Sequence, residues 1–234
     1  MADFTTIREE EKRYHDWFYS QHDLFVKGSW LSSPVKSVIE SLSLIQTDKP
    51  MVLDLGCGVG RNSIPMALSI RERQGKVDCV DLLETAIEPL RRYSKQYGIE
   101  DIINSYCSDI ADFSIPSGYY DFVVAVSSLE HVSSLEEFTC LLDRMIKGTR
   151  ECGIHCLVVN SEVKERDAET GEELPAMMEV NVSEAEMTAI LSEKYAYWKP
   201  IKVEAKPLQY EIKRRDKAIM MSTNAITYIV QKQQ

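Results

Sequence analysis

A glycine-rich turn between a strand and a helix places the strongest constraint on how this chain folds. Residues 51–55 read Met-Val-Leu-Asp-Leu, a short apolar run typical of a buried strand, and they lead directly into glycines at positions 56, 58 and 60. A helical pattern begins near Arg61. Glycine lets the backbone turn tightly and lie close to a ligand, and the free N–H groups at a helix start favour an anionic group. The sequence therefore predicts a strand, a ligand-binding turn and a helix in succession.

The rest of the chain alternates apolar runs with helical periodicity, which is typical of a parallel sheet with crossover helices. We expect strands near 50–55, 76–81, 102–107, 120–127 and 153–160, helices near 34–45, 61–73, 84–97, 134–147 and 183–194, and a final hairpin over 201–212 and 219–230 with its turn at 213–216. Ser183 and Glu186 have the spacing of a capping box for the last helix. The predicted fold is α/β: a Rossmann-like, doubly wound, mainly parallel sheet of seven strands with N-terminal helices and a C-terminal antiparallel hairpin.

The length of 234 residues suits one α/β domain with a full core. We expect a single domain over 1–234, in which residues 1–48 form a helical cap, 49–160 the ligand-binding core and 161–234 a loop, a helix and the hairpin. Residues 161–175 are polar and acidic and show no periodicity. They are therefore expected to form a mobile surface loop.

Composition narrows the classes of partner. The formal net charge is −10, with 37 acidic against 27 basic residues, so the field of the protein repels nucleic acid and anionic membranes. Residues 8–13 are charged, unlike a secretory signal, and the apolar runs are too short to cross a bilayer. The six cysteines lack the spacing of a metal site. We expect a cytoplasmic protein that acts on a small molecule, with no metal, no nucleic acid and no membrane partner.

Two carboxylates follow the glycines at the ends of later strands. Asp81 ends the second predicted strand, about 20 residues beyond the glycines, where a carboxylate can accept both hydroxyls of a ribose. Asp109 follows the third predicted strand, and the fourth runs into Ser-Ser-Leu-Glu-His at 127–131. These positions lie together because the carboxyl ends of parallel strands share one edge of the sheet.

In combination, these motifs resemble the class I S-adenosylmethionine-dependent methyltransferases over about residues 50–160. The family motif Asp-x-Gly-x-Gly-x-Gly is met at residues 54–60. The resemblance implies S-adenosylmethionine as cofactor, its methionine half beside the motif, its ribose on Asp81 and its adenine along Asp109 and Ile110. The full set of residues expected to bind the cofactor is Asp54, Gly56, Cys57, Gly58, Gly60, Asn62, Asp81, Leu82, Asp109, Ile110 and Val126.

A narrower resemblance concerns the acceptor. Residues 53–62, which include Arg61 and Asn62 after the glycines, and the run Glu-Val-Asn at 179–181 before a capped helix resemble the tellurite-resistance methyltransferases and their thiopurine-methylating relatives. This second resemblance implies a small, soft nucleophile, such as a metalloid oxyanion or a thiol.

Methyl transfer needs little from the protein beyond alignment of the acceptor and exclusion of water, because the cofactor carries its own activated methyl group. A general base is needed only for a protonated acceptor, and His131 is the best-placed candidate, ahead of Glu130 and Arg61. Tyr14, Trp17 and Arg61 are the residues expected to contact the acceptor. We expect the cover over the site to come from the first thirty residues and from 161–175.

Two other functions fit parts of the pattern. In a nicotinamide-dependent oxidoreductase Asp81 would also bind a ribose, but counting Gly-x-Gly-x-x-Gly from Gly56 or Gly58 meets Arg61 or Ser63 in place of the third glycine. The other alternative is a domain that binds the nucleotide without catalysis and serves as an interaction surface. The intact glycine motif argues against this second alternative and leaves it open.

Overall fold

The computed structural model describes residues 4–214 and 217–233, and its elements follow the predicted order. The helices are α1 (Phe4–Gln21), α2 (Lys36–Leu42), α3 (Ser63–Ile70), α4 (Glu84–Gln96), α5 (Leu135–Gly148) and α6 (Glu184–Lys194), with short 3-10 turns at Trp30–Ser32, Arg71–Arg73 and Leu129–His131. The strands are β1 (Met51–Leu55), β2 (Lys76–Asp81), β3 (Ile103–Cys107), β4 (Tyr120–Val126), β5 (Thr149–Asp167), β6 (Glu173–Leu174), β7 (Trp198–Arg214) and β8 (Lys217–Lys232).

All of these strands belong to one sheet, in the order β3-β2-β1-β4-β5-β8-β7, with the two-residue β6 paired to β5 beside this path. The pairs among β1 to β5 are parallel, whereas β8 is antiparallel to both β5 and β7. The predicted α/β fold is confirmed, with seven strands on the main path and an antiparallel hairpin at the end. β1 is the middle one of the five parallel strands, so the turn that follows it opens at the centre of the parallel part of the sheet edge.

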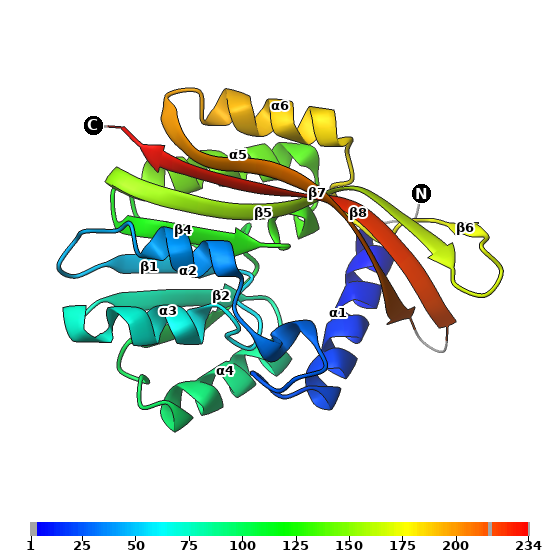
Figure 1. The fold of residues 1–234 in the computed structure, drawn as a ribbon, viewed down its shortest axis with the longest axis horizontal. Coiled ribbons are helices and arrows are strands. Elements are labelled where there is room, and N and C mark those ends of the chain that lie inside the picture. Colours follow the sequence, from blue (N-terminus) through cyan, green and yellow to red (C-terminus); the bar gives the residue numbers. More distant parts are fainter. Residues whose placement is uncertain (1–3, 215–216, 234) are drawn as a thin grey trace.

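Helices cover both faces of the sheet (Figure 1). On one face, α2, α3 and α4 bury a cluster that includes Val38, Ile64 and Leu90. On the other, α5 and α6 bury Phe138, Leu142 and Met187 against alternate residues of the same strands. Strands that are apolar on both faces are typical of parallel sheets enclosed between helices, and this arrangement keeps the strand ends in fixed positions.

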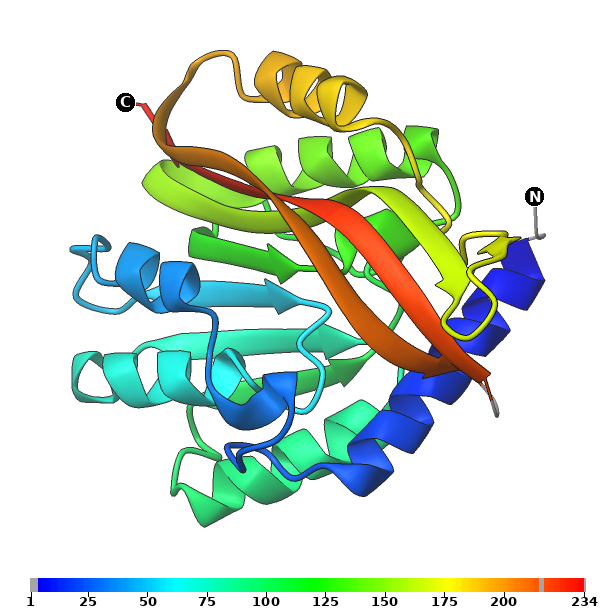
Figure 2. The same cartoon turned by 45° about the vertical axis from the view of Figure 1, so that its right-hand side comes forward.

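The first helix does not join either layer. Figures 1 and 2 show α1 standing across the ends of the strands, beside the far end of the hairpin. Thr85 at the start of α4 bonds to Asp16, and Tyr93 donates to Asp23 with an oxygen–oxygen distance of 3.2 Å. Helix α1 is therefore tied to the body of the domain at its C-terminal end and covers the carboxyl edge of the sheet.

The prediction of a mobile loop at 161–175 is wrong. β5 continues to Asp167, nineteen residues in all, and 173–174 form β6 on its edge. The sequence looks polar because outward-facing side chains alternate with buried ones, among them Val163 and Glu165. A register shift between Ser161 and Lys164, which interrupts the alternation, further hides the strand.

The C-terminal predictions are confirmed with longer strands than expected. β7 and β8 pair along almost their whole length, and residues 215 and 216 of the predicted turn lie outside the described residues. Ser183 caps α6 by accepting a bond from the backbone N–H of Glu186 at 3.2 Å. Within the described part of the chain, none of the helices has the length and apolar character that crossing a membrane requires.

Candidate active site

The glycine turn after β1 is held open by backbone conformation. Gly56, Gly58 and Gly60 have φ values of 74°, 53° and 97°, which side chains other than glycine rarely adopt. The N–H groups of Gly56 and Cys57 both donate to the carbonyl oxygen of Val80 at the end of β2. The turn is thus fixed against the neighbouring strand, with its remaining backbone edge toward the space above the sheet.

Asp81 braces this turn from the end of β2. Its two carboxylate oxygens accept from the N–H of Gly58 at 2.8 Å and from the N–H of Leu83 at 3.0 Å. Burial raises the pKa of Asp81, although these two backbone donors act in the opposite direction. A nearly buried carboxylate at the mouth of a glycine turn suits a ligand with paired hydroxyl groups.

Two of the predicted cofactor residues lie behind the turn. Asp54 is buried in β1 and accepts from the Ser63 hydroxyl at 2.6 Å, while burial raises the pKa of its carboxyl to about 7. A side chain at position 60 would meet Leu90 and Ile64 within about 3 Å. Asp54 and Gly60 therefore shape the turn from below and do not line the open space.

A cavity of about 650 Å³ lies above the turn, within the range of roughly 300–1,000 Å³ typical of small-molecule sites. Of the predicted residues it is lined by Gly56, Cys57, Gly58, Asn62, Asp81, Leu82, Asp109, Ile110, Val126, His131, Tyr14 and Arg61. The structure thus brings together twelve of the fifteen predicted site residues, and Asp54, Gly60 and Trp17 are the three outside the lining.

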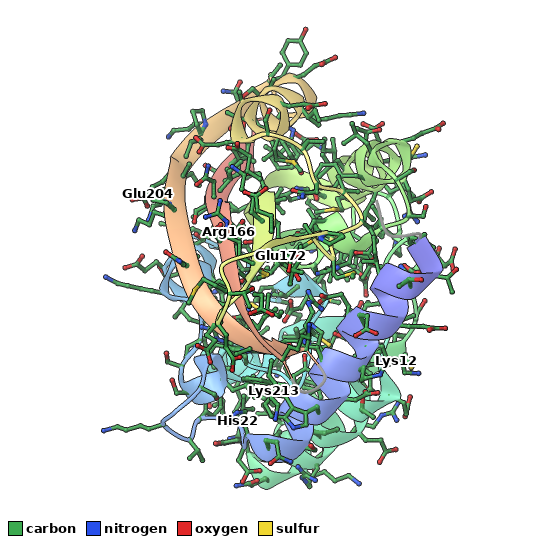
Figure 3. The ribbon with its side chains drawn as sticks, turned by 90° about the vertical axis from the view of Figure 1, so that its right-hand side faces the viewer. Lys12, His22, Arg166, Glu172, Glu204 and Lys213 are labelled. Carbon is green, nitrogen blue, oxygen red and sulfur yellow. The ribbon has the colours of Figure 1, made fainter. Side chains whose placement is uncertain are left out.

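Trp17 does not line the cavity. It is 42% exposed, and the Lys213 ammonium lies 6.0 Å from its ring centroid. The face of α1 that lines the cavity includes Glu11, His15 and Tyr19 at helical spacing, and Trp17 lies outside this face. In Figure 3, Lys12 lies along α1 and Lys213 lies beside it at the end of the hairpin.

His131 and Glu179 form a carboxylate–imidazole pair at the cavity. His131 Nδ1 lies 2.9 Å from a carboxylate oxygen of Glu179, whose side chain is only 2% exposed. Burial opposes charge on the ring, but the Glu179 bond and the carboxylates of Glu11 and Glu130 outweigh it and raise the pKa of His131 to about 9. In the described part of the chain, Nε2 has no hydrogen-bond partner, and the ring lines the cavity.

Comparison with known proteins finds similarity to methyltransferases. Residues 52–153 match the family model described as a methyltransferase domain. A ubiquinone biosynthesis O-methyltransferase of Rickettsia canadensis is 28% identical over 144 residues, which are 60% of this chain and 58% of that protein. The chain thus spans little more than half the length of this curated relative.

Solved structures share the fold. TehB from Haemophilus influenzae superposes with a TM-score of 0.62 at 19% identity and covers 94% of this chain and 67% of its own. A SAM-dependent methyltransferase from Methanosarcina mazei gives the same TM-score at 17% identity, over 86% of this chain and 99% of its own. Residues 52–153 are therefore similar to methyltransferase domains, and the chain shares the fold of these two solved structures.

Arg8 of α1 joins the two ends of the cavity. One guanidinium nitrogen lies 2.6 Å from a carboxylate oxygen of Asp109, and the other donates to the backbone carbonyl of His131 at 3.0 Å. Arg8 therefore connects the end expected to hold adenine with the segment that carries the imidazole. Nothing in the local sequence around Arg8 signals this role, because both partners are more than 100 residues away.

The C-terminal hairpin supplies the part of the cavity that sequence reasoning missed. Its end contributes Leu208, Tyr210, Glu211, Ile212, Arg214 and Met221, and the segment after β6 contributes Met178 and Glu179. Residues 161–175, which were expected to form part of the cover, do not line the cavity. The cover is instead α1 and the hairpin, because β7 and β8 extend beyond the edge of the parallel strands (Figure 2).

Arg214 connects the hairpin to α1 over the cavity. It bonds to Glu11 of α1 at 2.8 Å and to Glu165 of β5 at 2.7 Å and 3.1 Å. All three side chains are at least four-fifths buried. The opposing charges lower the pKa of Glu11 in spite of its burial. The single guanidinium thus holds three distant segments together.

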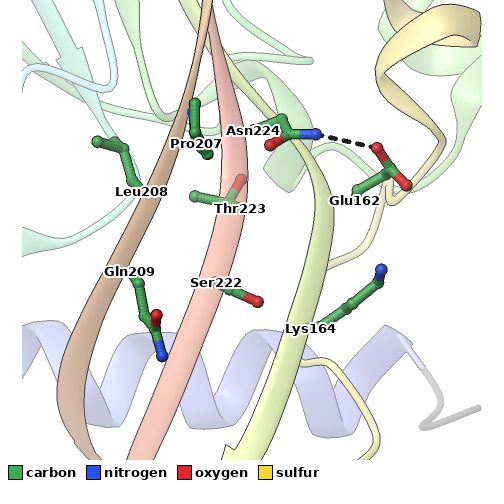
Figure 4. Close-up of a pocket in the computed structure, with 8 residues that line it drawn as sticks. All are labelled: Glu162, Lys164, Pro207, Leu208, Gln209, Ser222, Thr223 and Asn224. Atoms are coloured by element: carbon green, nitrogen blue, oxygen red, sulfur yellow. Dashed lines mark hydrogen bonds between the residues drawn. The ribbon is translucent and has the colours of Figure 1, made fainter.

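A second hollow of about 360 Å³ lies on the hairpin where β5, β8 and β7 run side by side (Figure 4). Its lining is mainly polar, and Glu162 accepts from the Asn224 amide at 3.0 Å across it. It includes no residue of the glycine turn and no histidine. The chemistry of the domain therefore belongs to the larger cavity.

Proposed function

We propose that this protein transfers a methyl group from S-adenosylmethionine to a small molecule by in-line displacement. The observation that carries the proposal is that one cavity is lined by both the glycine turn and the His131–Glu179 pair. α1 and the hairpin cover it, so water would be largely excluded when an acceptor is bound. A covered space of this size suits a metabolite and not a duplex or a folded protein.

The residues at the glycine end fit the cofactor. The backbone edge at Gly58 and the carboxylate of Asp81 would hold its amino-acid and ribose parts, and Asp109 and Ile110 would flank the base. Tyr19 of α1 lies close over the turn, since a Cβ at Gly58 would lie 2.9 Å from its hydroxyl. The bound cofactor supplies a methyl group already activated on a positive sulfur.

His131 is the group proposed to handle a proton. With a pKa of about 9 its ring is mostly protonated at neutral pH, so it serves as a base only through the neutral fraction, which grows tenfold per pH unit up to that value. Glu179 fixes the ring so that Nε2 is the nitrogen left for the acceptor. Glu130 is buried and bonds to Asn160, so it is removed from this role.

For the acceptor, we propose a chemical class and not a single compound. The metalloid oxyanion or thiol expected from the sequence and the hydroxyl suggested by the name of the Rickettsia relative are all small nucleophiles. A catalytically idle nucleotide-binding domain would not need a covered histidine with an oriented ring. A nicotinamide enzyme would need a glycine where Arg61 or Ser63 stands.

Calorimetric titration with S-adenosylhomocysteine and, separately, with NAD tests the proposal, followed by turnover on thiols, hydroxyl compounds and tellurite. We expect binding of S-adenosylhomocysteine only. Asp81→Ala should weaken it at least about tenfold, because charge-assisted hydrogen bonds are worth about 1.5–3 kcal/mol each. Asp78→Asn is the matched control, since Asp78 lies in the same strand, bonds to Tyr120 and Asn104 and does not line the cavity. Binding of NAD in place of S-adenosylhomocysteine would refute the proposal.

A further inference from the structure

The acceptor end of the cavity has an apolar side. Beyond the two large clusters of the core, a third, smaller cluster lies under the hairpin. Four of its members also line the cavity, and we call them the apolar wall: Tyr14, Met178, Ile212 and Met221. Met178, Ile212 and Met221 are each less than 10% exposed. Because methionine side chains adapt their shape, such a wall can pack against a ring or an alkyl chain.

Next to the wall, two cations are already paired with carboxylates. Arg214 is bonded to the two carboxylates of Glu11 and Glu165, and the charged His131 is bonded to that of Glu179. A further anion would lose its hydration against the wall and would have to compete with these carboxylates for the paired cations. The charges favour an acceptor that enters without charge.

We propose, building on the methyl transfer proposed above, that the acceptor is an apolar organic molecule with a protonated, weakly acidic hydroxyl or thiol, whose body packs on the apolar wall and whose proton is taken by His131. Hydroxyl and thiol acceptors share a proton that must be removed before methylation. The apolar body that carries this group distinguishes them from inorganic oxyanions.

The step balances in atoms and charge. With His131 in its neutral form, the O–H or S–H proton of the acceptor passes to Nε2, and the electron pair left on oxygen or sulfur forms the bond to the methyl carbon. The electron pair of the broken carbon–sulfur bond stays on the leaving sulfur, which becomes neutral. The positive charge thereby moves from the sulfonium to the imidazole, where Glu179 stabilises it.

Binding is the first readout. The protein saturated with S-adenosylhomocysteine is titrated with 4-alkylphenols from methyl to butyl and with sodium tellurite. We expect affinity to rise about fourfold per added methylene, the size of the hydrophobic effect for one buried CH₂ group, and tellurite to bind more weakly than 4-butylphenol. Met221→Gln should flatten this rise. Met220→Gln is the matched control, because Met220 is the adjacent residue of β8 and does not line the cavity.

Acceptor acidity is the second readout. His131→Asn should slow methylation of 4-ethylphenol by about 10²- to 10⁴-fold, the usual contribution of a general base, but slow that of 4-nitrophenol far less, since 4-nitrophenol is largely ionised at pH 8. Equal losses for both phenols would overturn the proton-transfer role.

Tighter binding of tellurite than of 4-butylphenol, or no dependence on chain length, would overturn the apolar acceptor. Failure of S-adenosylhomocysteine to bind would instead refute the methyl transfer itself. Methylation of tellurite alone would leave the methyl transfer standing and reject only the acceptor class.

Discussion

The two ends of the cavity are built by different means. At the cofactor end, consecutive residues of one turn present backbone groups, and Asp81 holds them through two N–H bonds. At the acceptor end, side chains from α1, the Leu129–His131 turn, the segment after β6 and the hairpin meet. Three ion pairs made by His131 and Arg214 hold them together. The first end depends on backbone conformation, and the second depends on charge pairing between distant segments.

Because of this difference, the two ends are sensitive to different changes. A turn made of backbone fails when a side chain is added, because the left-handed conformation and the close approach are both lost. A site made of paired side chains is sensitive to pH and to the removal of one partner, because the other charge is then left buried. Each end can therefore be disrupted by a change that leaves the other intact.

Gly58→Val should produce the largest effect and should act at the cofactor end alone. Position 58 has a φ of 53°, and a Cβ there would lie 2.9 Å from the Tyr19 hydroxyl, so a branched side chain intrudes where the ligand must lie. We expect calorimetry to detect no binding of S-adenosylhomocysteine, while circular dichroism shows a folded protein.

Gly98→Val is the control for backbone strain. Gly98 has a similar φ of 62° but has no atom within 4 Å of the added carbon, and it does not line the cavity. Both variants therefore carry a left-handed penalty of roughly 1–2 kcal/mol or more, and only the first should lose binding. Equal binding by the two variants would show that the turn is structural only.

A change of pH should act at the acceptor end through His131. Its pKa is about 9 in the folded protein against 6.5 in the unfolded chain, so its contribution to stability is complete below pH 6.5 and is lost as pH rises through 9. The loss amounts to as much as about 3 kcal/mol, from 1.36 kcal/mol per pKa unit. Urea unfolding of the protein and of Glu179→Gln between pH 6 and 9.5 measures it, and the variant should show the smaller decline.

Asp54 also titrates near this range, because burial raises its pKa to about 7, but it does so equally in both proteins and cancels in their difference. Glu173→Gln is the control on the neighbouring segment. Glu173 pairs with Arg166 while 79% exposed, so its removal should leave the pH dependence unchanged. A parallel decline in the protein and in Glu179→Gln would contradict the assignment of the slope to this pair.

The cofactor end could be read from the sequence because its determinants are local. The strand at 51–55, the glycines and Asp81 each act through the backbone next to them, so their spacing already contains their geometry. The other parallel strands could be predicted for the same reason, because a short apolar run between two turns is nearly always a buried strand in an α/β fold. The exception was the polar extension of β5, because a register shift and the buried carboxylate of Glu165 make its sequence unlike an ordinary strand.

The acceptor end could not be read in this way. Glu11, Glu165 and Arg214 lie up to 203 residues apart, and each alone looks like an ordinary surface charge. The length of the hairpin decides which of its residues reach the cavity, and strand ends are the part of a sequence prediction that varies most. Trp17 shows the same limit on a smaller scale, since a helix predicted correctly still leaves open which of its faces turns inward.

Arg8 lies where the two ends meet, and it gives the smallest effect and the sharpest test of their connection. It bonds to Asp109 at the cofactor end and to the His131 carbonyl at the acceptor end. A double-mutant cycle of Arg8→Gln and Asp109→Asn, measured by urea unfolding, should give a coupling energy of about 0.5–1 kcal/mol. The two side chains are 28% and 17% exposed, so solvent screens their attraction only in part. The pair Lys36 and Glu40, at 88% and 61% exposure, should give nearly zero in a matched cycle. If saturating S-adenosylhomocysteine abolishes the Arg8–Asp109 coupling, the ligand and Arg8 compete for the same carboxylate, and the cofactor end controls how firmly α1 closes the acceptor end. A coupling of zero without ligand would mean that the two ends are held independently.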